Sequence, residues 1–268
     1  MLAVLPLWLL HLVGVALGWA AFLGSPTYRR RFLAHAAQAG YRFGDVAGAV
    51  AAAGQLVAEL PRLWFGRPAP LQWRGQELIE AALAAGRGIV FLTPHLGCFE
   101  ATAQGYASRY GPITVLYRPP RKAWLRPLVD AARARPNLAA APTTLAGVKQ
   151  MLKALQAGQA VGLLPDQVPP QGMGVWAPFF GQPAYTMTLS ARLARQTGAT
   201  VLLAWGERLS WGRGYRIHLR AWPGELPAAP EAAAARVNAQ MESLVRECPA
   251  QYLWGYARYK EPREAPAA

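Results

Sequence analysis

A histidine and a glutamate separated by four residues stand in the stretch 88–100, as His95 and Glu100. A neutral imidazole takes a proton from an alcohol, and a carboxylate on its other ring nitrogen fixes the tautomer and stabilises the imidazolium that forms. The pair therefore predicts general-base catalysis on a hydroxyl group. The alternative is structural: His95 caps a loop, and Glu100 offsets the dipole of the helix that follows.

The turn between a strand and a helix must position this pair. Residues 89–92 form a continuous apolar run, typical of a strand covered on both faces, and Pro94 ends it. From residue 99 the pattern is helical. In one continuous helix, residues five apart point about 140° away from each other, so the two side chains can meet only across the turn. The backbone N–H groups of residues 96–98, at the helix start, are candidate donors to a developing oxyanion.

Three further polar side chains follow predicted strands of the same sheet. Arg118 comes after the strand at 113–117, and Asp166 and Gln167 come after the strand at 160–164. Because ligands bind at the carboxyl ends of parallel strands, we expect these residues beside the histidine. The guanidinium of Arg118 suits a phosphate or a carboxylate, with an ordinary loop arginine as the alternative. Asp166 and Gln167 either hold their loop or bind substrate, and the histidine is preferred over Asp166 as the base.

Strand and helix patterns alternate along most of the chain, which is typical of an α/β fold. We expect a mostly parallel central sheet flanked by helices, with strands at 199–205 and 215–221 antiparallel to each other. Residues 168–181 are apolar, proline-broken and rich in glycine, so we expect no regular structure there but the lining of a fatty-acyl channel. The other predicted strands are 71–74, 89–92, 113–117, 138–141 and 160–164; the predicted helices are 76–85, one from 99, 123–134, 145–157, 186–196 and 230–246, after one or two amphipathic helices within 28–65.

The N-terminal stretch 2–24 contains no Asp, Glu, Lys or Arg and is long enough for a transmembrane helix, since about 22 helical residues span roughly 33 Å. Residues 29–31 are all arginine, so the positive-inside rule places everything after them in the cytoplasm. A cleaved signal peptide is the alternative, disfavoured because no Lys or Arg precedes the apolar run. Gly14 and Gly18 give a small-xxx-small spacing that can pair helices. We expect a membrane anchor at 1–27, a catalytic domain at 28–262 and a disordered tail at 263–268.

The chain has 28 Lys and Arg against 14 Asp and Glu, a formal net charge of +14. This charge suits an anionic phospholipid leaflet, a phosphorylated glycolipid or an acidic carrier protein. Nucleic acid is disfavoured as a partner because the sequence has no zinc-finger spacing, aromatic RNA-binding signature or recognition-helix motif. The only cysteines, Cys98 and Cys248, are too few for a disulfide scaffold. Cys98 lies near enough to His95 to be considered as a nucleophile, with a small apolar filler as the favoured alternative.

Four further motifs follow His95-x4-Glu100 in order: Leu116-Tyr117-Arg118-Pro119, Leu164-Pro165-Asp166-Gln167, Ala177-Pro178-Phe179-Phe180-Gly181 and Gln251-Tyr252-Leu253-Trp254. Together they resemble the bacterial lipid A late acyltransferases, the lauroyl and myristoyl transferases of the lysophospholipid acyltransferase superfamily, whose signature is H-x4-D/E. The resemblance runs from the N-terminal anchor to Lys260. It departs in the closing segment, which reads Trp-x-His-x-Arg in that family and has Tyr256 here in place of the histidine.

The resemblance implies a membrane-anchored O-acyltransferase that moves a fatty acyl chain from an acyl carrier protein thioester to a hydroxyl of a lipid A precursor. It implies His95 as the base, Glu100 as the group that orients it, and Arg118, Asp166 and Gln167 as substrate-binding residues, with no cofactor and no metal. The expected location is the bacterial inner membrane, with a single span and the catalytic domain on the cytoplasmic side. Two alternatives stay open: acylation of a glycerophospholipid or an aminolipid, and a non-catalytic lipid-binding or carrier-docking protein on the same fold.

Overall fold

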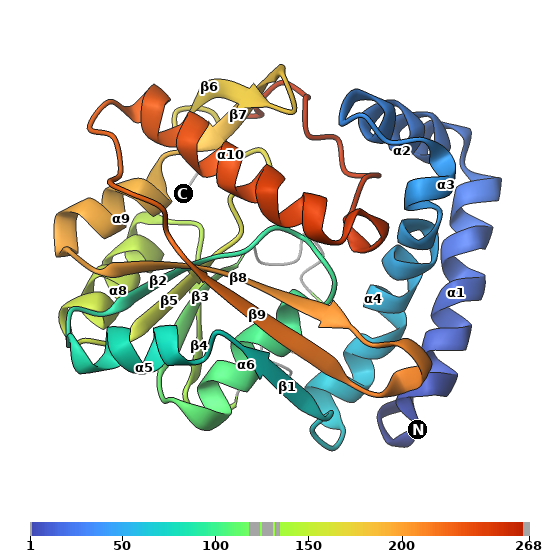
Figure 1. The fold of residues 1–268 in the computed structure, drawn as a ribbon, viewed down its shortest axis with the longest axis horizontal. Helices are drawn as coiled ribbons and strands as arrows, with labels where there is room; N and C mark the ends of the chain where they lie inside the picture. The colour runs from blue at the N-terminus through green and yellow to red at the C-terminus, as the bar shows by residue number, and fades with distance from the viewer. Residues whose placement is uncertain (1, 118–123, 125–130, 132–134, 265–268) are drawn as a thin grey trace.

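A seven-stranded sheet runs through the middle of the molecule in the order β1-β9-β8-β2-β5-β3-β4 (Figure 1). The computed structural model describes residues 2–117, 124, 131 and 135–264. Neighbouring strands of this sheet are parallel except β8 and β9, which are antiparallel, so the predicted mostly parallel α/β sheet is confirmed. The strands are β1 (Leu71–Arg74), β2 (Ile89–Leu92), β3 (Ile113–Tyr117), β4 (Leu138–Pro142), β5 (Ala160–Leu163), β8 (Thr200–Arg208) and β9 (Tyr215–Ala221).

Helices cover both faces of the sheet, as Figure 1 shows. The central strand β2 is therefore buried at every position, which explains its continuous apolar run. Ile89 and Phe91 point to the face covered by α5 (Glu77–Ala84) and α6 (Phe99–Arg109), while Val90 and Leu92 point to the opposite face. That second face is covered by α8 (Leu145–Gln156), α9 (Leu189–Thr197) and α10 (Pro230–Glu247).

A β-hairpin overturns the expectation that residues 168–181 lack regular structure. Strands β6 (Gly174–Phe179) and β7 (Gln182–Met187) pair antiparallel around a two-residue turn. Both turn residues, Phe180 and Gly181, have positive φ, as tight hairpin turns require. Prolines mask these strands in the sequence, yet a two-stranded ribbon tolerates them because each strand has one edge without ladder bonds. The predicted start of the next helix at 186 is also wrong, since β7 ends at Met187 and α9 begins at Leu189.

Two parts of the sequence-based prediction lie outside the described residues. One is the helix expected at 123–134, of which only residues 124 and 131 are described, and the other is most of the tail expected at 263–268. The region at 28–65 contains three helices where one or two were expected: α2 (Pro26–Gln38), α3 (Phe43–Val46) and α4 (Gly48–Phe65).

The first helix, α1 (Leu7–Gly24), lies side by side with α4 at one end of the molecule (Figure 1). Glycines let the two backbones approach: a Cβ on Gly18 would lie 2.1 Å from the carbonyl oxygen of Val50, and a Cβ on Gly54 would lie 2.0 Å from that of Gly14. The small-xxx-small spacing therefore pairs two helices of the same chain. Two segments of the described chain are long and apolar enough to cross a membrane, Leu7–Gly24 and Phe43–Phe65.

This packing predicts that alanine at Gly54 destabilises the protein, although alanine is the better helix former by about 1 kcal/mol. The added methyl meets backbone atoms of α1, so we expect a net loss of about 1–3 kcal/mol in the free energy of unfolding, measured by denaturant titration in detergent. Gly24→Ala is the control, because no atom lies within 4 Å of a Cβ at Gly24. A Gly54→Ala protein as stable as the wild type would contradict close helix contact.

Candidate active site

The loop that follows β2 is fastened to the loop that follows β5 through one carboxylate, that of Asp166. Its Oδ1 lies 2.7 Å from Nδ1 of His95, and its Oδ2 accepts the backbone N–H of the same residue at 2.8 Å. Asp166 is 2% exposed. The carboxylate on the ring is therefore Asp166, where the sequence led us to expect Glu100.

The hydrogen-bond partners of His95 determine its tautomer. An ionised carboxylate only accepts hydrogen bonds, so Nδ1 carries the proton and donates it to Asp166. Nε2 then has a free lone pair, which accepts a hydrogen bond from Nε2 of Gln167 at 3.0 Å. The ring is thereby held with a proton-accepting nitrogen toward Gln167, which is the arrangement of a general base.

The environment of Asp166 keeps it ionised. Burial alone would raise the pKa of its carboxyl, but the interaction with His95 and the hydrogen bonds that His95 donates outweigh burial and hold the pKa below its ordinary value. The buried guanidinium of Arg258 acts in the same direction. An ionised Asp166 in turn stabilises the imidazolium that forms when His95 takes a proton.

The backbone of the His95 turn is fixed by neighbouring segments on both sides. Gly97 has a φ of +60°, and a Cβ there would lie 2.0 Å from the carbonyl oxygen of Gly206, so only glycine fits. The N–H groups of Leu96, Gly97 and Cys98 donate to the carbonyl oxygens of Pro94, Gln251 and Gly206, respectively. The expectation that these N–H groups face a developing oxyanion is therefore wrong, because each already has an acceptor within the protein.

Glu100 and Cys98 differ in their surroundings. Glu100 stands in the first turn of α6, is 8% exposed, and lines the same cavity as His95. Cys98 is fully buried, and burial raises the pKa of its thiol well above the ordinary value, so no thiolate is available near neutral pH. These observations favour the interpretation of Cys98 as a small apolar filler.

A cavity of about 810 Å³ is lined by His95 and by residues of α6. This volume is within the range of about 300–1,000 Å³ typical of small-molecule sites. Thr93, His95, Glu100 and Gln167 line its polar part, together with Val168 to Pro170 from the segment expected to line an acyl channel. Its apolar part lies between α6 and the sheet and is lined by Trp73, Ile79, Phe91, Tyr106, Ile113, Leu138 and Leu219.

The structure thus brings together four of the five residues singled out in the sequence. His95, Asp166 and Gln167 are joined by hydrogen bonds, and Glu100 lines the same cavity as His95 and Gln167. Arg118 lies outside the described residues. Among the described residues, no three His, Cys, Asp or Glu side chains are grouped so that they would hold a metal ion.

Tyr256, the residue that departs from the family pattern, supports the Asp166 loop. Its hydroxyl oxygen accepts the backbone N–H of Val168 at 3.0 Å, and its ring lines the cavity. The ammonium of Lys260 lies 4.9 Å from the centre of that ring. Sequence reasoning gave Tyr256 no role, and the only available signal was its position in the closing motif.

The sequence of this chain is similar to those of several proteins named as lipid acyltransferases. The chain is 30% identical over 190 residues to the lipid A biosynthesis lauroyltransferase of Escherichia coli K12, covering 69% of this chain and 60% of that protein. It is 26% identical over 212 residues to the lipid A biosynthesis palmitoleoyltransferase of the same organism, covering 77% of this chain and 68% of that protein. A phosphatidylinositol mannoside acyltransferase of Mycobacterium tuberculosis is 28% identical over 170 residues, covering 60% of this chain and 52% of that protein.

The match to the lauroyltransferase thus spans less than two thirds of that relative's length. A family model described as bacterial lipid A biosynthesis acyltransferase matches residues 46–261. This range includes His95, its partners Asp166 and Gln167, and all the described residues that line the cavity. The chain belongs to the bacterial lipid A biosynthesis acyltransferase family.

Proposed function

We propose that this protein is an O-acyltransferase that moves a fatty acyl chain from an acyl carrier protein thioester to a hydroxyl group of a lipid A precursor. The observation that carries the proposal is the His95 ring, which lines a largely apolar cavity and has an unprotonated nitrogen that is hydrogen-bonded to the amide of Gln167. Family membership supplies the substrate class. A purified-protein assay with acyl carrier protein thioesters and a panel of acceptor lipids tests it.

The reaction begins when the acceptor hydroxyl replaces the Gln167 amide on Nε2 of His95. The ring takes the hydroxyl proton, the oxygen attacks the thioester carbonyl, and a C–O bond forms as the C–S bond breaks. The imidazolium then returns the proton to the departing sulfur. No covalent enzyme intermediate is needed, which agrees with a buried, protonated Cys98.

Two carboxylates and one amide support this transfer. Asp166 orients the ring and stabilises the imidazolium, and the side chain of Glu100 lines the same cavity as the ring. The displaced amide of Gln167 becomes a hydrogen-bond donor close to the reacting carbonyl, a role that the engaged N–H groups of residues 96–98 cannot fill. Arg118 is proposed to bind an acceptor phosphate.

The apolar part of the cavity is proposed to hold the acyl chain. It lies between α6 and the sheet, where Gly105 lets the helix approach: a Cβ there would lie 2.8 Å from side-chain carbons of Ile217 and Leu71. A chain entering beside His95 has an apolar path toward Trp73 and Ile79. Burying it there removes hydrocarbon from water, which favours binding of the donor.

The paired helices α1 and α4 are proposed to attach the protein to the inner membrane, with the catalytic domain on the cytoplasmic side. Trp8, Val13 and Leu17 of α1 and Val57 of α4 are exposed, and such an apolar surface marks a membrane or protein contact. The arginines that follow α1 support a cytoplasmic position for the rest of the chain. A single span within residues 2–24 stays a prediction.

A second acceptor class is kept because one relative bears the name phosphatidylinositol mannoside acyltransferase. The same base and cavity would serve a hydroxyl of a glycerophospholipid or an aminolipid, and Tyr256 stands where the lipid A enzymes usually have histidine. A non-catalytic lipid-binding protein is the alternative of a different class. The panel of acceptor lipids distinguishes acylation of a lipid A precursor from acylation of a glycerophospholipid or an aminolipid. Absence of transfer with retained lipid binding would favour the non-catalytic lipid-binding protein.

The catalytic proposal predicts the effect of substitutions at the base. His95→Ala removes the proton acceptor and should lower turnover by about 100-fold or more. Asp166→Asn places a donor or a neutral acceptor against Nδ1, so it should lower turnover on a similar scale, and Glu100→Gln should also depress it. Because the groups act as one unit, the losses in double variants should not add.

Cys98→Ala is the control for this series and should retain near wild-type turnover. Circular dichroism and binding of the acceptor lipid establish that each variant is folded. A folded His95→Ala protein that transfers acyl chains at the wild-type rate would refute the mechanism, and loss of transfer in Cys98→Ala alone would replace the base with a thiol nucleophile.

The cavity predicts that added volume shortens the preferred acyl chain. Gly162 of β5 lines the cavity, and a Cβ there would meet only side-chain atoms, 3.3 Å from Val115 and 3.8 Å from Ile113. Gly162→Leu should therefore shift the preferred donor to chains shorter by several carbons, read out by competition among donors of different length. Gly44→Leu adds the same volume where no atom lies within 4 Å, and it should leave the preference unchanged. An unaltered preference in Gly162→Leu would place the acyl chain elsewhere.

The excess of basic residues predicts salt-sensitive use of the carrier protein. Attraction between exposed charges is screened beyond about 8 Å at physiological ionic strength, so added salt should raise KM for the acyl carrier thioester. A neutral short-chain thioester serves as the comparison and should show little change. Equal salt sensitivity of both donors would argue against an electrostatic docking surface.

A further inference from the structure

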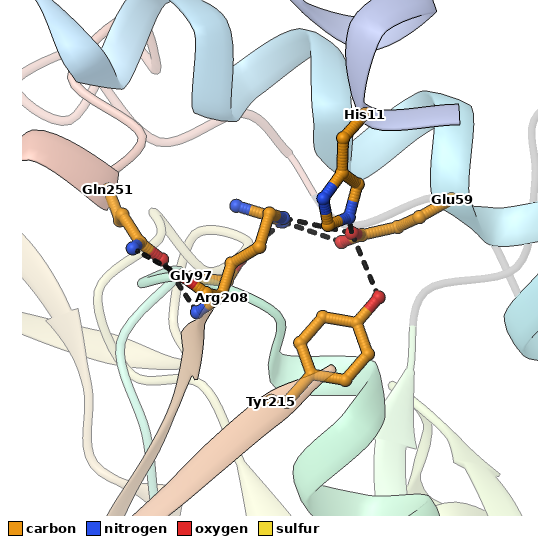
Figure 2. Close-up of polar contacts among 6 residues, drawn as sticks. All are labelled: His11, Glu59, Gly97, Arg208, Tyr215 and Gln251. Carbon is orange, nitrogen blue, oxygen red and sulfur yellow. Dashed lines mark hydrogen bonds and ion pairs between the residues drawn. The ribbon is translucent and has the colours of Figure 1, made fainter. Parts of the chain in front are cut away.

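A buried charged cluster contacts the His95 turn at Gly97 (Figure 2). Its centre is Glu59 of α4, which is 0% exposed. Glu59 accepts hydrogen bonds from Nε and Nη2 of Arg208 at 2.8 and 2.5 Å and from the hydroxyl of Tyr215 at 3.0 Å. Nε2 of His11, from α1, lies 3.1 Å from Oε2 of the same carboxylate.

This cluster joins segments that are far apart in the sequence: α1, α4, and the ends of β8 and β9 that meet at their hairpin. A buried ion pair contributes little net stability over a well-packed apolar pair, because desolvation of both charges offsets their attraction. Its value lies in fixing one arrangement, since a partner that moves away leaves a charge buried without compensation. Burial lowers the pKa of Arg208, but the Glu59 carboxylate more than offsets this and raises it, so the arginine stays charged.

Arg208 connects the cluster to the catalytic loop, which we define as residues 95–98. Its Nη2 donates to the carbonyl oxygen of Gly97 at 3.3 Å. Its backbone N–H and C=O each bond the side-chain amide of Gln251, at 2.9 and 3.0 Å. The carbonyl oxygen of Gln251 in turn accepts the N–H of Gly97 at 3.0 Å. Both backbone groups of Gly97 are therefore held by Arg208 and its partner Gln251.

The loop that is held in this way carries the base. His95 lies two residues before Gly97, and its own carbonyl oxygen accepts the N–H of Leu253, next but one to Gln251, at 3.2 Å. The hydrogen bonds with Asp166 fix the ring of His95, and the hydrogen bonds at Gly97 fix the backbone of the loop. Of these two sets, only the hydrogen bonds between His95 and Asp166 have a role in the proposed mechanism.

We propose that Glu59, Arg208 and Gln251 are positioning residues for the catalytic loop, and that α1 completes this support by docking His11 against Glu59. The N-terminal helix then has a second role besides membrane attachment: its docked position sets the geometry of the base. The catalytic part of this inference rests on the proposed function, whereas the structural part does not.

Hydrogen exchange at the loop, followed by mass spectrometry on the full chain in detergent, tests the structural part without an activity assay. His11→Leu removes one hydrogen bond to the buried carboxylate and leaves an apolar side chain against α4. We expect the amides of Gly97 and Cys98 to exchange about tenfold faster in this variant. Gln251→Leu, which removes both side-chain bonds to Arg208, should accelerate the same amides at least as much.

Leu12→Ala is the matched control, because Leu12 neighbours His11 on α1 but is 55% exposed, and it should leave exchange unchanged. The amides of β4, at the far edge of the sheet, are the internal control and should keep their wild-type rates in every variant. Wild-type exchange at Gly97 and Cys98 in His11→Leu would overturn the inference. Equal acceleration in β4 would also overturn it, since that result means general destabilisation.

Steady-state kinetics test the catalytic part. A loop that is mispositioned should lose turnover, so kcat of His11→Leu should fall about tenfold while KM for the acyl donor stays within about twofold. Faster exchange at the loop with unchanged kcat would refute the catalytic role of α1. If the wild-type protein transfers no acyl chain, the proposed function is refuted. Faster exchange at the loop in His11→Leu would still support the structural part of the inference.

Discussion

A carboxylate removed from water must be given hydrogen-bond donors, and most of the site follows from how Asp166 obtains them. The backbone N–H and the ring of His95 supply two, and both come from the turn after the neighbouring parallel strand. Satisfying one buried charge therefore joins two strand ends, selects one tautomer of the ring and leaves the other ring nitrogen to accept a hydrogen bond from Gln167. Arg258 adds a positive charge that favours ionised Asp166, and Tyr256 holds the backbone of the same loop at Val168, so residues near the end of the family match support a group from its middle.

The positions of the site residues were predictable because they depend on strand ends. The apolar run before Pro94 and the strand before Asp166 have lengths and compositions that allow little else, and parallel pairing then places their carboxyl ends together. The identity of the partner of His95 was not predictable in this way. Glu100 is close in sequence, whereas Asp166 is 71 residues away, and periodicity carries no information on which carboxylate reaches Nδ1. The choice between the two carboxylates depends on how the loops that follow β2 and β5 are placed relative to each other in three dimensions.

The β6–β7 hairpin and the ion pair of Glu59 with Arg208 were not predicted from the sequence. The prolines of residues 168–181 suggested irregular structure, although one of them, Pro178, faces Pro183 in the β6–β7 ribbon. Glu59 gave a usable signal, since a single carboxylate in an alanine-rich apolar helix needs a partner when it is buried. The partner itself, Arg208, stands at the end of a strand 149 residues later, and its pairing depends on the approach of α4 to the β8–β9 hairpin.

The amide of Gln167 on Nε2 of His95 has a consequence for how the protein would treat its donor. A base that faces a thioester also activates water, and hydrolysis would then waste the acyl chain before an acceptor arrives. In the structure the amide occupies the lone pair that would accept a proton from such a water molecule. Under the proposed function, only a hydroxyl held well enough to displace Gln167 gains access to the base. The resting site would therefore protect the bound thioester from hydrolysis until an acceptor hydroxyl binds.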